Sequence, residues 1–119
     1  MHMIRLNTIV KEVSLFEAGF PEDLSFEDFA KKRLEGATKI SNDAKKKGGA
    51  ALLTHHHFVV KLPHYQKAAD GNFNLAEAQI ELKNHLNELC SMTSDMDQIH
   101  FQELVGLIEV LGELIIKSK

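Results

Sequence analysis

Residues 50–64 read AALLTHHHFVVKLPH, and the conformation of this central stretch decides the fold class. Its apolar residues fall on more than one side of a helix, a pattern typical of a buried helix. Pro63 disfavours helical geometry at Leu62 and so ends that helix. The β-branched content of residues 58–62 favours a strand instead, but a lone strand would have no partner unless the N-terminus supplied one. We therefore expect a helix over 50–62.

The preceding stretch has clear signals for a helix start and a helix stop. Ser25 with Asp28 three residues later is a near match to a capping box, with Asp in place of the usual Glu. Apolar residues recur from there at helical spacing until Gly48 and Gly49 supply the stop. Residues 45–47 are three lysines in the last turn, where cations complement the helix dipole. The pattern predicts one long helix from Ser25 to Gly48.

Three further helices are expected downstream. The first is short, begins at Pro63 and is closed by the turn at residues 70–71. The second follows Asn74, whose side chain is a good helix cap, and shows leucines on one face. The last is capped by Ser94 or Asp95 and runs to about residue 117.

The N-terminal end completes the predicted architecture. Apolar spacing from Ile9 favours a helix that ends near Gly19 and Pro21, although the first few residues could pair as a short strand. The sequence thus predicts an all-α fold over a single domain, residues 1–119. We expect one compact bundle of five or six helices, mostly antiparallel because the connections are short.

The composition of the chain argues against several classes of protein. The chain has 119 residues, of which 44% are hydrophobic and 26% charged, as in an average globular domain. A net charge of -3 without a broad basic block argues against nucleic-acid binding. No apolar run reaches the roughly 18 residues needed to span a bilayer. The start of the chain lacks the features of a secretory signal, so we expect a cytoplasmic protein without membrane contact.

The seven histidines are the most unusual feature of the composition. Residues 55–57 are three consecutive histidines, which lie about 100° apart on a helix and cannot all face one metal ion. On a helical wheel His56 lies among apolar residues and His57 at their edge. His100 lies near the centre of the apolar stripe of the last helix. We therefore expect His56 and His100 inside the bundle.

Buried histidines indicate a metal site as one functional alternative, since neutral imidazole is the commonest protein ligand for zinc and iron. Helical bundles hold metals with inward carboxylates and a Glu-x-x-His pair on each of two helices. This chain has Asp97-x-x-His100 once, with His100-x-x-Glu103 in reverse order. The candidate ligands for a transition metal such as zinc or iron are His56, His57, Asp97, His100 and Glu103.

A small-anion site is a related alternative. Arg33 falls on the buried side of its helix. Its stem could cover apolar surface while the guanidinium reaches water, or the guanidinium could clamp an anion or form a buried ion pair. Together with His56 and His100 it could form the polar end of a pocket for a small molecule bearing a carboxylate or phosphate.

The main functional prediction is self-association or partner binding. The chain has no nucleophile, phosphate-loop or dinucleotide motif, so no catalytic residue is assigned. Cys90, the single cysteine, is expected to be a small buried packing residue. The apolar stripe of the last helix is wider than one contact requires, which predicts a homodimer through that helix.

Overall fold

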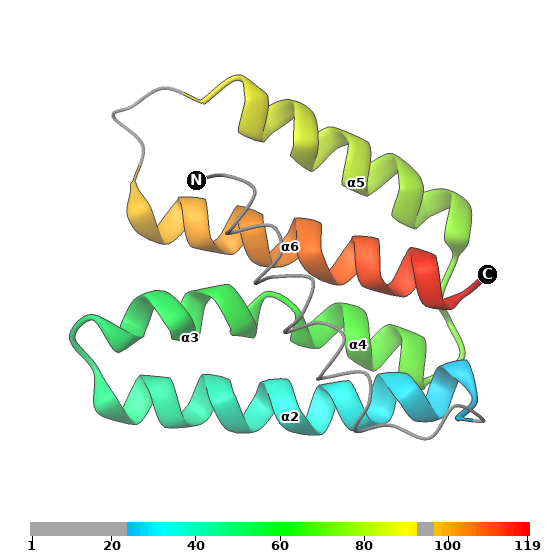
Figure 1. The fold of residues 1–119 in the computed structure, drawn as a ribbon, viewed down its shortest axis with the longest axis horizontal. Helices are drawn as coiled ribbons and strands as arrows, with labels where there is room; N and C mark the ends of the chain where they lie inside the picture. The colour runs from blue at the N-terminus through cyan, green and yellow to red at the C-terminus, as the bar shows by residue number, and fades with distance from the viewer. Residues whose placement is uncertain (1–23, 93–96) are drawn as a thin grey trace, which may run out of the picture.

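The computed structural model describes residues 24–92 and 97–119, and every regular element in these two ranges is a helix (Figure 1). The elements in chain order are α2 (Phe26–Lys47), α3 (Ala51–Val59), α4 (Leu62–Ala69), α5 (Leu75–Cys90) and α6 (Gln98–Lys117). The predicted all-α class is therefore confirmed. The helix expected from Ile9 lies outside the described residues.

The described helices lie side by side as four rods, because α3 and α4 follow one another almost end to end (Figure 1). Helix α2 packs on both α3 and α4, α3 packs on α6, and α5 packs on α6. Figure 1 shows α2 antiparallel to the α3–α4 rod and α5 antiparallel to α6. The antiparallel arrangement agrees with the sequence, but the expected count of five or six bundle members is not confirmed.

Helix α2 begins and ends where its signals indicate. The Ser25 hydroxyl accepts a hydrogen bond from the Asp28 backbone N–H at 3.1 Å. At the other end Gly48 has a φ of 66°, a left-handed backbone conformation that residues with a Cβ rarely adopt. Lysines 45–47 occupy the last turn, as expected.

The helix expected over 50–62 is divided in two. Helix α3 ends at Val59 and α4 begins at Leu62, with Pro63 in its first turn. The physical reason is that a proline ring clashes with the carbonyl four residues earlier, which here belongs to Val59. Pro63 therefore ends the preceding helix at Val59 and not at Leu62, where the sequence analysis placed the end.

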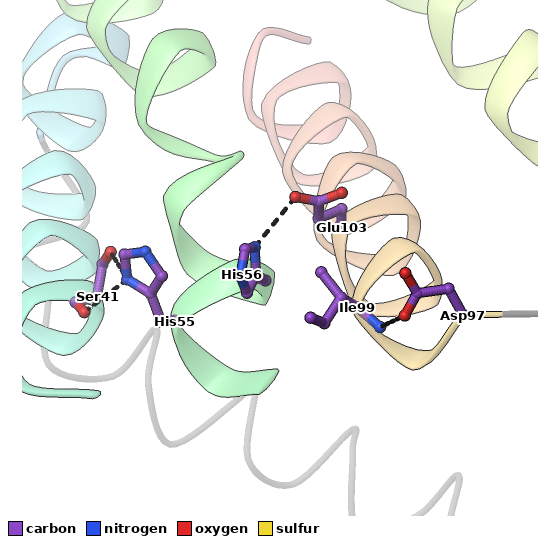
Figure 2. Close-up of polar contacts among 6 residues, drawn as sticks. All are labelled: Ser41, His55, His56, Asp97, Ile99 and Glu103. Carbon is purple, nitrogen blue, oxygen red and sulfur yellow. Dashed lines mark hydrogen bonds and ion pairs between the residues drawn. The ribbon is translucent and has the colours of Figure 1, made fainter. Parts of the chain in front are cut away.

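The caps of the last two helices agree with the sequence in one case only. The Asn74 side chain accepts from the Glu77 N–H at 3.0 Å and starts α5, as predicted. Helix α6 starts at Asp97, whose carboxylate accepts from the Ile99 N–H at 2.9 Å (Figure 2). The N-cap of α6 is therefore neither Ser94 nor Asp95, and both of these lie outside the described residues.

The core lies between the rods and combines small side chains on three helices with large ones on α6. Small residues let neighbouring helices approach closely, so the buried alanines set the spacing of the rods; they are Ala30, Ala37, Ala44, Ala68, Ala69 and Ala78. The large buried side chains of α6 are Leu104, Val110, Leu111, Leu114 and Ile115. No helix in the described ranges has the length and apolar content that crossing a membrane requires.

Candidate functional site

Three carboxylates of α6, those of Glu103, Glu109 and Glu113, face donors from the neighbouring rods. We call this row the carboxylate seam. Its partners lie on α3, on α4, at the junction between them, and on α2. The seam therefore joins three of the four rods by polar contacts.

The most buried contacts of the seam surround Glu113. The Tyr65 hydroxyl donates to Glu113 Oε1 at 2.7 Å, and an Arg33 terminal nitrogen lies 3.3 Å from Glu113 Oε2. The Arg33 side chain is 5% exposed and that of Glu113 is 27% exposed. Burial, together with the negative charge of Glu113, raises the pKa of Tyr65 above its ordinary value, so the hydroxyl keeps its proton. Arg33 is thus in a buried ion pair.

In the middle of the seam, Glu109 contacts one histidine and one lysine. His57 Nε2 lies 3.3 Å from Glu109 Oε2, and Lys61 Nζ lies 3.3 Å from Glu109 Oε1. Burial alone would raise the pKa of Glu109, but the hydrogen bond from His57 and the charge of Lys61 outweigh it and lower that pKa. Glu109 is therefore ionised at neutral pH.

At the far end of the seam, His56 and His55 turn to opposite sides of α3 (Figure 2). His56 Nδ1 lies 3.1 Å from Glu103 Oε2, so this ring nitrogen donates to the carboxylate. His55 Nδ1 donates instead to the Ser41 carbonyl of α2 at 2.9 Å. The divergence follows from the helix geometry, since consecutive residues point about 100° apart.

The residues predicted for a small-anion pocket each contact a different carboxylate. Arg33 contacts Glu113, and His56 contacts Glu103. The His100 ring lies 3.2 Å from Glu88 of α5. Because each group has a carboxylate beside it, none offers a free positive charge to an incoming anion. The interpretation that the Arg33 guanidinium reaches water is wrong, whereas the buried ion pair is observed.

His100 is not inside the bundle, because its side chain is 51% exposed. Its angular position on the wheel agrees with the apolar stripe of α6. However, His100 belongs to the first turn of α6, and the buried part of that helix begins only at Leu104. The expectation of a buried His100 was wrong. Helical periodicity gives the direction of a side chain around the helix, but it does not show whether that turn of the helix lies within the core.

The predicted metal ligands do not form a cluster either. In residues 24–92 and 97–119, no three His, Cys, Asp or Glu side chains come together in a way that could hold a metal ion. His56 meets Glu103 and His57 meets Glu109 as separate pairs. The Asp97 carboxylate caps α6.

Half of the residues in the seam and its contacts were not predicted from the sequence, and the exposure of the thiol was predicted wrongly. The sequence analysis singled out neither Lys61 and Tyr65 nor their partners Glu109 and Glu113. A signal was present, because both pairs have a spacing of four residues, which places two side chains on one helix face. Cys90 was expected to be buried but is exposed at the end of α5.

A pH-dependent loss of stability is expected from His64. Burial lowers its pKa, Glu81 opposes the shift, and the charges of His85 and Lys67 add to it. As the pH falls below about 6.5, His64 is protonated more readily in the unfolded chain than in the folded chain. The free energy of unfolding therefore falls as the pH falls. Urea unfolding should show that a His64→Gln variant loses less stability between about pH 8 and pH 5.5 than the natural chain does. Equal losses in both proteins would contradict this prediction.

Each carboxylate of the seam has at least one donor from a neighbouring rod within 3.3 Å. Comparison of the chain with protein-family models, with curated proteins and with solved structures gives no significant match.

Proposed function

We propose that the protein acts by self-association, with two copies packing through α5. The observation that supports this proposal is the position of α5 at the edge of the row of rods (Figure 1). Among the described helices it packs extensively on α6 alone, and its only buried residue is Ala78. An edge helix of this kind normally has a polar outer side, but α5 exposes Leu75, Ile80 and Leu86.

The exposed side of α5 is nearly free of charge. At about 100° per residue, one side of the helix combines exposed apolar and uncharged polar residues with a single lysine. We call this side the outer face of α5, and it consists of Leu75, Ala76, Gln79, Ile80, Lys83, Leu86, Asn87 and Cys90. The carboxylates of α5 are engaged elsewhere: Glu77 and Glu81 contact α4, and Glu88 contacts His100 of α6.

A face with one lysine and no carboxylate can meet its own copy with little like-charge repulsion. Symmetric dimers place the same surface patch of both subunits in contact, so a self-complementary face is required. The wide apolar stripe of α6, on which the sequence placed the dimer, is largely used in the core. Its exposed large side chains, Ile99, Phe101 and Ile116, lie near the two ends of the helix. For this reason we place the contact on α5.

Sedimentation equilibrium of the natural chain and of an Ile80→Asp variant tests the proposal. Ile80 is 62% exposed, so a carboxylate at this position should not disturb folding. We expect the natural chain to dimerise and the variant to dimerise at least about tenfold more weakly, since a buried unpaired charge opposes association. Ile40→Asp, at an exposed position on α2, is the matched control and should dimerise like the natural chain.

The single cysteine supplies an independent measurement. A nitroxide attached to Cys90 labels the outer face of α5 at one site without further substitutions. A symmetric α5 contact should give one narrow distance between the two labels, and Ile80→Asp should remove it. A natural chain that remains monomeric up to about 1 mM, the upper limit of weak association, would overturn the proposal.

A further inference from the structure

A groove on the opposite flank of α5 forms a small cavity between α4, α5 and α6. Its volume is about 250 Å³. The floor is apolar and consists of Phe73, Ala78, Leu111 and Leu114. The rim has four ionisable side chains, His64 and Lys67 on α4 and Glu77 and Glu81 on α5. An apolar floor with a few polar groups at its rim is the usual composition of a small-molecule site.

The rim has an excess of negative charge. Lys67 Nζ lies 3.3 Å from Glu77 Oε2, so these two charges balance. Glu81 faces only the His64 ring among the described residues, at 3.9 Å. Burial lowers the pKa of His64, so the ring is neutral near pH 7. Among the described residues, no lysine or arginine forms an ion pair with the Glu81 carboxylate.

We propose that this groove binds a small organic cation with an ammonium group and a short apolar body. The ammonium would lie against the Glu81 carboxylate and the body against Phe73 and Leu111. The volume equals roughly eight water molecules at about 30 Å³ each, which leaves room for a small ligand only. An anion of the same size would be repelled by Glu81. The site lies on a different side of α5 from its outer face, so it does not depend on dimerisation.

An NMR titration with 2-phenylethylammonium tests the site, with phenylacetate as a probe of the same shape and opposite charge. The cation should cause saturable shifts in the amide signals of His64, Phe73 and Glu81, and phenylacetate should cause none. Glu81→Gln keeps the shape of the rim but removes its charge, and should weaken binding of the cation about fivefold. Glu88→Gln, on the same helix but outside the groove, is the matched control and should leave binding unchanged.

Three results would each overturn the proposal: no saturable shift with the cation at millimolar concentration, equal binding of phenylacetate, or equal affinity in the Glu81→Gln variant. Because Glu81 is exposed at the rim, this variant should fold, and its amide spectrum verifies that directly.

Discussion

Replacing Glu113 by alanine is expected to lower the free energy of unfolding by about 3 kcal/mol. The substitution would leave the Arg33 guanidinium buried without this carboxylate and remove the acceptor of the Tyr65 hydroxyl. Removing one partner of a buried ion pair costs about 3–5 kcal/mol, and the partial exposure of Glu113 places the estimate at the lower end. Urea denaturation followed by circular dichroism measures the change.

The matched control replaces the whole ion pair. Arg33→Met with Glu113→Leu should cost much less than Glu113→Ala, because well-packed apolar residues often substitute for a buried pair with little loss. Tyr65→Phe in the natural chain should cost only about 1 kcal/mol, the usual value for one hydrogen bond. If Glu113→Ala costs less than about 1 kcal/mol, the pair is solvated in the way of a surface salt bridge and the prediction fails.

The features that the sequence predicted correctly are those that depend on a few neighbouring residues. Ser25 and Asn74 each accept a hydrogen bond from a backbone N–H three residues later, so the signal for the helix start lies within four positions. Gly48 stops α2 for an equally local reason, its positive φ. Helix periodicity also placed Arg33 on the buried side of its helix, because it specifies the direction of a side chain around its own helix.

The features that the sequence did not predict depend on which helices become neighbours. His56 lies beside Glu103 only because α3 packs on α6, and these residues are separated by 47 positions in the chain. Likewise, the exposure of the His100 side chain depends on where the core begins along α6. The seam and the groove both require the order of the rods, and no local pattern specifies that order.

The contact between α3 and α6 yields the second large effect, at Gly106. A methyl group added at this position would overlap the backbone carbonyl oxygen of His57 and lie 2.8 Å from Val60 Cγ2. A carbonyl in a helix cannot rotate away, so the two rods would have to separate. Overpacking of this kind costs about 1–3 kcal/mol or more, against about 1 kcal/mol gained in helix propensity. We expect Gly106→Ala to destabilise the protein by about 2 kcal/mol in urea denaturation.

Gly112 is the matched control, because it lies in the same helix and an added methyl group there has no atom within 4 Å. Gly112→Ala should therefore raise the stability by about 0.5–1 kcal/mol, the helix propensity gain alone. Adding Val60→Ala to Gly106→Ala separates the two causes of strain, since it removes the side-chain contact and leaves the His57 carbonyl in place. We expect no rescue from this second substitution. A stabilising Gly106→Ala would show that α3 and α6 do not approach through backbone contact at this point.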